Sequence, residues 1–141
     1  WPVPGLAELL EELAGRGIKL GIVSNAQFYT PLALEALLGG SRARSCFDPA
    51  LCVWSYRLKE AKPSPRLAGA ALDALRTAYG IAPGETVVAG NNPEKDILPA
   101  AALGCTAVLC TADAGPGTPA PEPAARAAAI IGDLRDLAAI V

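Results

Sequence analysis

Apolar residues recur along the chain in two alternating patterns. Leucines within residues 6–13 are spaced three and four positions apart, so they form one stripe of a helix that we expect to end near Gly15. The next segment, residues 18–23 (IKLGIV), is largely apolar and of strand length. An uninterrupted run of this kind is typical of a strand buried on both faces.

The alternation continues to the end of the chain. Cap residues followed by proline, at Thr30-Pro31 and Ser64-Pro65, mark the starts of two further helices. These two helices are expected over 30–38 and 65–79. The remaining expected elements are a strand near 51–54, a strand over 86–89, a helix between Pro93 and Gly104, strands over 106–110 and 129–131, and a helical tail capped by Asp133. Residues 113–123 are rich in Pro and Gly, which indicates a surface loop.

Strands that alternate with helices predict an α/β fold whose parallel sheet is covered by helices on both faces. A length of 141 residues fits one domain. In such sheets ligands bind at the carboxyl ends of the strands. This rule selects three segments, which are Ser24-Asn25, residues 59–63 and residues 90–96.

The composition of the chain argues against several classes of binding partner. The formal net charge is −2, with 12 basic and 14 acidic residues and no basic stripe, so we expect neither nucleic acid nor an anionic membrane as a partner. No apolar run approaches the ~20 residues that span a bilayer, and we expect no signal peptide. Four cysteines (Cys46, Cys52, Cys105 and Cys110) without CxxC spacing, and no histidine, favour reduced thiols in a cytoplasmic protein over a zinc site.

The three segments at strand ends carry chemistry that suits an anion. The hydroxyl of Ser24 and the amide of Asn25 fit an oxyanion such as phosphate, although both residue types are also common in caps and turns. Lys62, just before a helix start, would add a positive charge, unless it is an ordinary surface lysine. Gly90 permits a close backbone approach, and Asp96 offers a carboxylate to Mg²⁺ or simply sits in a polar loop.

In their order and spacing these segments resemble the second, third and fourth motifs of the haloacid dehalogenase (HAD)-like hydrolase superfamily. The flanking sequences resemble it as well, over residues 4–25 (PGLAELLEELAGRGIKLGIVSN), 62–65 (KPSP) and 87–109 (VVAGNNPEKDILPAAALGCTAVL). The resemblance implies a HAD-like Rossmannoid three-layer fold, with residues 1–141 forming the C-terminal part of the core domain, without its first motif and cap.

The resemblance also implies a mechanism. In the family an aspartate attacks phosphorus, and water then hydrolyses the covalent intermediate. By the family pattern Ser24 and Lys62 are catalytic, Ser24, Asn25 and Lys62 bind the phosphoryl group, and Asp96 with Asn91 holds Mg²⁺ beside the nucleophile. The expected function is a Mg²⁺-dependent phosphatase acting on a small phosphorylated metabolite.

Two features depart from the family pattern. The sequence has no Asp-x-Asp. In the family this motif is carried by a strand at the centre of the sheet, between the strands that correspond to residues 18–23 and 86–89. The sequence before Pro4 contains no such strand. The chain also begins at Trp1 and contains no Met. We therefore expect the missing N-terminal strand upstream in a longer protein or on a partner chain, and we expect this chain alone to be inactive.

The second departure is Asn91, an amide where the family usually has an acidic residue, which lowers the expected affinity for Mg²⁺. Whether the protein is an enzyme is thus open, and two alternatives are a non-catalytic phosphate-binding or interaction domain and a metal-free 2-haloacid dehalogenase. A receiver domain would need an acidic pair where Ser24-Asn25 stand. A dinucleotide-binding domain would need glycines after the first strand, whereas Gly15 and Gly17 precede it.

Overall fold

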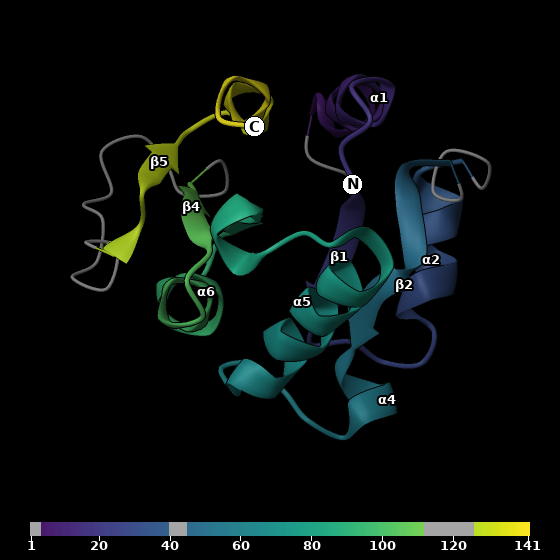
Figure 1. Cartoon of the computed structure of the whole chain (residues 1–141). Coiled ribbons are helices and arrows are strands. Elements are labelled where there is room, and N and C mark those ends of the chain that lie inside the picture. Colours follow the sequence, from purple (N-terminus) through teal and green to yellow (C-terminus); the bar gives the residue numbers. More distant parts are fainter. Residues whose placement is uncertain (1–3, 40–44, 112–125) are drawn as a thin grey trace.

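The computed structural model describes residues 4–39, 45–111 and 126–141, and its helices and strands alternate as the sequence predicts (Figure 1). The elements are α1 (Leu6–Gly15), β1 (Leu20–Ser24), α2 (Thr30–Leu37), β2 (Phe47–Trp54), α4 (Ser55–Leu58), α5 (Pro65–Tyr79), β3 (Val87–Gly90), α6 (Leu98–Ala102), β4 (Thr106–Cys110) and β5 (Ala129–Ile131). Three short helical turns join them: η1 (Pro83–Glu85), η2 (Pro93–Ile97) and η4 (Leu134–Ala139). The loop expected over 113–123 falls outside the described residues.

The five strands form two parallel sheets rather than one. β1 pairs with β2, and β3, β4 and β5 pair in that order. Among the described residues no strand joins β1 to β3, so the parallel sheet is incomplete at its centre. This confirms the expected α/β fold and the expected interruption.

The interruption shows in the burial of the strands. β4 has a neighbour on both sides, and its Ala107, Val108 and Leu109 are at most 2% exposed. Within the described part of the chain β1 and β3 are each paired on one side, and Gly21 and Ala89 are exposed. The prediction of a strand over 18–23 buried on both faces is therefore wrong for β1, because the strand that would cover its free edge is not among the described residues.

Helices cover both faces of the sheet formed by β1 and β2. α1 and α2 pack on one face of β1 and β2, around Leu10, Leu38 and Cys46. α5 packs on the other face of the same strands, as Figure 1 shows. A separate cluster joins η2, α6 and β4 around Ile97 and Leu109. Each sheet therefore has its own hydrophobic cluster.

The termini of the helices follow local sequence signals to different degrees. At α5 the prediction is confirmed, because the Ser64 hydroxyl accepts a hydrogen bond from the Arg66 N–H at 3.4 Å and Gly80 ends the helix in the left-handed conformation, with φ of 70°. At α2 the predicted cap is wrong. Thr30 is the first helical residue, and its hydroxyl accepts from the Gln27 N–H at 3.1 Å, closing the preceding turn instead.

The helix predicted between Pro93 and Gly104 is broken in two. Residues 93–97 form the wide turn η2, and α6 begins only at Leu98. The reason is Pro99, which has no N–H to donate to the carbonyl four residues earlier and fits only in the first turn of a helix.

The four cysteines have reduced thiols, as expected, and Cys46 and Cys105 are buried. Burial raises the pKa values of the Cys52 and Cys105 thiols. Within the described ranges, none of the helices has both the length and the apolar character that a membrane crossing requires.

A polar cluster lies at the amino ends of the strands, opposite the expected site. The Tyr79 hydroxyl donates to Asp48, whose other oxygen accepts from the Ala50 N–H at 2.8 Å, and Lys19 lies over the Tyr79 ring at 5.0 Å. The hydrogen bond from Tyr79 lowers the pKa of Asp48, and the same bond raises the pKa of Tyr79.

We predict that the tyrosinate titration contains a step above pH 10 that Tyr79→Phe removes. Because the folded pKa of Tyr79 is raised, its stabilising effect is present below the unfolded pKa and is lost as pH rises through the folded value. Asp48→Asn removes the charged acceptor and should move the step to lower pH, as measured by absorbance. An unchanged step in Asp48→Asn would contradict the assignment.

We also predict that Leu109→Ala lowers the free energy of unfolding by about 2–5 kcal/mol, because Leu109 is 2% exposed inside its cluster and its truncation leaves a cavity. Leu32→Ala makes the same change on α2, where Leu32 is 67% exposed, and should alter stability by less than about 0.5 kcal/mol. Urea unfolding of both variants measures the difference. Equal effects would show that the cluster is not a packed core.

Candidate functional site at the carboxyl ends of the strands

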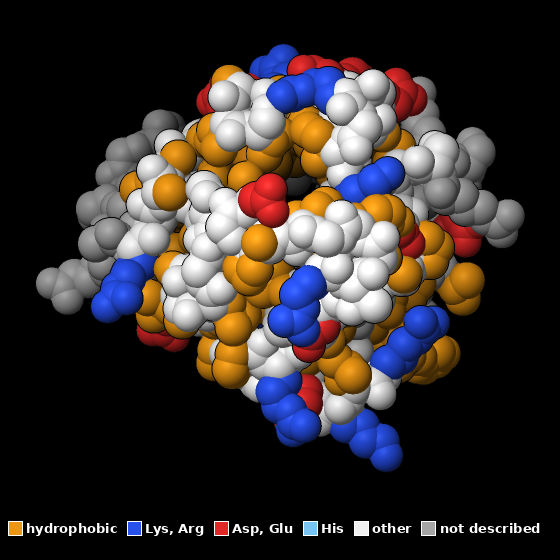
Figure 2. All heavy atoms as spheres, in the orientation of Figure 1, with side chains coloured by type: hydrophobic (Ala, Val, Ile, Leu, Met, Phe, Trp, Pro, Cys, Tyr) orange, Lys and Arg blue, Asp and Glu red, His pale blue; other side chains and the backbone are white. Residues whose placement is uncertain are grey.

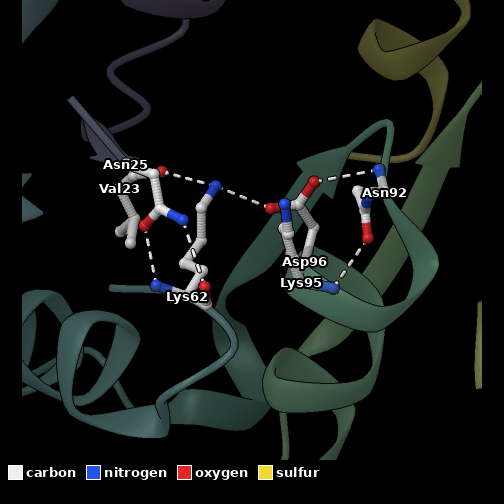
Figure 3. Close-up of polar contacts among 6 residues, drawn as sticks. All are labelled: Val23, Asn25, Lys62, Asn92, Lys95 and Asp96. Carbon is white, nitrogen blue, oxygen red and sulfur yellow. Dashed lines mark hydrogen bonds and ion pairs between the residues drawn. The ribbon is translucent and has the colours of Figure 1, made fainter. Parts of the chain in front are cut away.

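The centre of the site is an ion pair that crosses the interruption between the two sheets. The Lys62 ammonium donates to Asp96 Oδ1 at 2.6 Å and to the backbone carbonyl of Val23 at 3.0 Å (Figure 3). Val23 belongs to β1, and Asp96 follows β3. One ammonium group thus joins the carboxyl ends of both sheets.

Asn25 holds the backbone of Lys62 in place. Its side-chain oxygen accepts from the Lys62 N–H at 2.7 Å, and its side-chain NH₂ donates to the Lys62 carbonyl at 3.1 Å. These reciprocal bonds tie the loop after β1 to a segment 37 residues away. A cis peptide bond between Lys62 and Pro63 follows directly.

A second pair of hydrogen bonds holds the loop that follows β1. The Ser55 hydroxyl accepts from the Ala26 N–H at 2.9 Å and donates to the Ala26 carbonyl at 3.2 Å. Ser55 begins α4, directly after β2, which runs parallel to β1 with Ser24 beside Trp54. The half-buried Ser24, the last residue of β1, is therefore followed by a loop that is anchored on both sides.

Asp96 is positioned by the turn η2. Its Oδ2 accepts from the Asn92 N–H at 3.0 Å, and the Asn92 side chain in turn accepts from the Lys95 N–H at 2.9 Å (Figure 3). Gly90 makes room for this arrangement, since a Cβ at that position would lie 2.4 Å from the Cβ of Asp96. Any larger residue would displace the carboxylate from the end of β3.

The environment of the ion pair strengthens it. The side chains of Lys62 and Asp96 are 20% and 10% exposed, so water screens their charges only partly. A charge-assisted bond in such surroundings is stronger than a neutral hydrogen bond, and removing one partner leaves the other charge poorly solvated. The site thus presents an ammonium held between the end of β1 and the turn η2.

The structure brings together four of the five residues predicted from the sequence: Ser24 and Asn25 at the end of β1, Lys62, and Asp96. The fifth, Asn91, is exposed in the turn directly after β3. Sequence reasoning missed the supporting residues. Asn92 has a local signal, a capping side chain just before a proline, whereas Ser55 has none because its partner is 29 residues away.

The oxygen atoms available to a metal ion are a partial set. Asp96 offers one carboxylate, and Asn91 can offer an amide oxygen in the neighbouring turn. Both are the hard ligands that Mg²⁺ prefers, so their chemistry fits this ion. Within the ranges that the structure describes, no three acidic, cysteine or histidine side chains gather, so further carboxylates would have to come from outside the described residues.

A cavity of about 180 Å³ lies next to the ion pair, in the gap between β1 and β3. Lys62, Lys95 and Asp96 line its polar end, and Val23 and Val88 are among the residues of its walls. The candidate site therefore opens onto the interruption of the sheet.

Comparisons of the sequence with protein families and with curated proteins agree on one family. The sequence model of the haloacid dehalogenase-like hydrolases matches residues 2–104. Phosphoserine phosphatase of Thermus thermophilus is 32% identical over 134 residues, which are 95% of this chain and 49% of that protein. The chain thus spans about half the length of this curated relative.

Solved structures agree. The crystal structure of a HAD phosphatase from Thermococcus onnurineus is 27% identical, with a TM-score of 0.79 over 97% of this chain and 56% of that one. A 2-haloacid dehalogenase from Pseudomonas syringae pv. tomato is 25% identical, with a TM-score of 0.68 over 99% of this chain and 53% of that one. With three motif segments meeting at the carboxyl ends of a parallel sheet, and a family match over most of its length, the chain belongs to the haloacid dehalogenase-like hydrolases.

Proposed function

We propose that this chain is the larger part of a phosphatase core that hydrolyses a small phosphorylated metabolite in the cytoplasm. The observation that carries the proposal is the Lys62 ammonium, fixed between Asp96 and Val23, which precedes Ser24 in β1. A positive charge held rigidly at the carboxyl ends of the strands suits the negative charge of a transferring phosphoryl group. The similarity to phosphoserine phosphatase supports the same class of reaction.

In the proposed reaction an aspartate from outside this chain attacks phosphorus, forming an acyl phosphate as the alcohol leaves. Water then attacks the acyl phosphate, which releases inorganic phosphate and restores the carboxylate. Lys62 offsets the charge of the nucleophile and of the phosphoryl oxygens, and the Ser24 hydroxyl donates to one of those oxygens. This chain alone should not turn over substrate.

The role of Asn25 is more specific than the family pattern implies. Both functional groups of its side chain bond to the backbone of Lys62, so we assign it as a positioning residue for the lysine. Direct contact with the phosphoryl group through this side chain would require these bonds to break.

Asp96 and Asn91 would hold Mg²⁺, together with the external carboxylate. A bound Mg²⁺ would supply positive charge for the phosphoryl oxygens. Because Asn91 is neutral, the described residues of the site contribute one anionic ligand, that of Asp96, and the affinity should be modest.

The test is the hydrolysis of p-nitrophenyl phosphate with Mg²⁺ by a protein extended to the length of the relatives. Release of p-nitrophenol by the extended protein, and none by residues 1–141, supports the proposal. Absence of turnover by a folded extended protein would favour a non-catalytic phosphate-binding domain. Chloride release from a 2-haloacid, without metal, would instead identify a dehalogenase.

We predict that Lys62→Ala in the extended protein lowers kcat by about 10²–10³, because a preorganised charge at the reacting phosphoryl group is lost. Arg76→Ala is the matched control. It removes a cation from the far end of α5, where Arg76 is 70% exposed and paired with Asp73, and it should leave kcat unchanged. Equal losses in the two variants would contradict the role of Lys62.

We also predict that Asn91→Asp tightens Mg²⁺ binding roughly tenfold, because it adds a second anionic ligand. Asn92→Asp adds the same charge one residue away, where the side chain is occupied by the Lys95 N–H, and should have little effect. Calorimetric titration with Mg²⁺ measures both variants. Equal tightening in the two would indicate a general charge effect and not a defined site.

A further inference from the structure

Ser55 uses its hydroxyl for a distant partner and not for its own helix. It is the first residue of α4, a helix of four residues whose N-cap residue, Trp54, makes no capping hydrogen bond with its side chain. The Ser55 hydroxyl instead accepts from the Ala26 N–H at 2.9 Å and donates to the Ala26 carbonyl at 3.2 Å, across 29 positions of sequence. The needs of α4 therefore do not account for this hydroxyl.

The two bonds continue the pairing of β1 with β2 beyond its last backbone pair. The ladder ends where Ser24 lies beside Trp54, because the next residue, Ser55, begins a helix. A hydroxyl both donates and accepts, so it can take the place of a backbone partner for Ala26. Trp54 is 5% exposed, which means that the hydroxyl is carried by a residue next to the packed interior.

Two contacts with distant segments thus hold the loop directly after Ser24. Asn25 is held by the backbone of Lys62, and Ala26 is held by the hydroxyl of Ser55. The first contact fixes the loop relative to the lysine, and the second fixes it relative to β2. Donors that stabilise a developing charge are effective when they are already in place. The Ser55 contact supplies such preorganisation next to Ser24.

The surface around α4 suits an anion. Arg57 and Lys59 are exposed there, and Figure 2 shows lysine and arginine side chains at the surface around this helix. Residues 55–62 contain three basic residues and one acidic residue, in a chain whose formal net charge is −2. A local excess of positive charge attracts anionic ligands. Ser55 therefore approaches the loop from a side that favours a phosphorylated substrate.

We propose that Ser55 is a positioning residue of the candidate site, which keeps the Ser24 hydroxyl in place to donate to a phosphoryl oxygen. The inference rests on the proposed function and adds a residue that acts through the loop without touching the substrate. A serine that only satisfied the backbone of Ala26, which is 8% exposed, would affect stability alone. Kinetic measurements distinguish these two roles.

The first test is the hydrolysis of p-nitrophenyl phosphate by a protein extended to the length of the relatives. Ser55→Ala should lower kcat about tenfold and change KM less than about twofold, because the lost geometry matters most in the transition state. Ser55→Thr keeps the hydroxyl and should recover most of kcat. An unchanged kcat in Ser55→Ala, or an equal loss in Ser55→Thr, would overturn the proposal.

Thr111→Val in the extended protein is the matched control. The Thr111 hydroxyl donates to the Ile131 carbonyl at 3.2 Å, which is a bond of the same kind between the ends of β4 and β5 in the other sheet. Urea unfolding should show a loss of stability in both variants, whereas kcat should fall in Ser55→Ala alone. Equal losses of kcat would show that Ser55 acts through stability, and the proposal would fail.

A double substitution tests whether Ser55 acts through Ser24. Once Ser24→Ala has removed the donor, adding Ser55→Ala should lower kcat by less than about twofold, because the two residues serve one interaction. A further loss of about tenfold, equal to that of the single variant, would show that Ser55 acts independently of Ser24. That result would overturn the assignment.

Calorimetric titration of the extended protein with inorganic phosphate separates this inference from the proposed function. Phosphate binding that weakens in Ser55→Ala but not on adding Ser55→Ala to Ser24→Ala, in a protein that hydrolyses no phosphoester, would retain the positioning role and reject the phosphatase. Hydrolysis with the same kcat in the unmodified protein and in Ser55→Ala would do the reverse. A folded protein that neither binds phosphate nor hydrolyses the ester would reject both.

Discussion

The ion pair of Lys62 and Asp96 is the contact on which the candidate site depends. It places one ammonium group between the carboxyl ends of two sheets that have no strand pairing with each other among the described residues. Hydrogen bonds from both neighbouring loops fix its two partners. Asn25 holds the backbone of Lys62, and the turn after Gly90 folds the Asp96 carboxylate back over β3.

The interruption of the sheet explains several features that are otherwise unrelated. β1 has an apolar sequence but is only half-buried, whereas β4 of similar composition is buried. Each sheet has its own hydrophobic cluster, and the space between the sheets is lined by apolar side chains on both faces. All of these follow from a parallel sheet that is incomplete at its centre among the described residues.

The sequence predicts the elements well where the signals are local. The leucine stripe of α1, the Ser64-Pro65 start of α5 and the apolar run of β4 each depend on neighbouring residues, and the strand-end rule placed Ser24, Lys62 and Asp96 on one edge. Contacts between distant segments, such as Asn25 with Lys62 or Ala26 with Ser55, leave no local pattern. Pro99 is a local signal for the break between η2 and α6, and the prediction of one helix between Pro93 and Gly104 does not take it into account.

Amide hydrogen exchange tests the central claim, that the gap between β1 and β3 is a strand position filled from outside this chain. In residues 1–141 alone, amides of β1 and β3 should exchange faster than those of β4, which is paired on both sides. In a protein extended to the length of the relatives, β1 and β3 should become as protected as β4. Equal protection of all three strands in residues 1–141 alone would contradict the account.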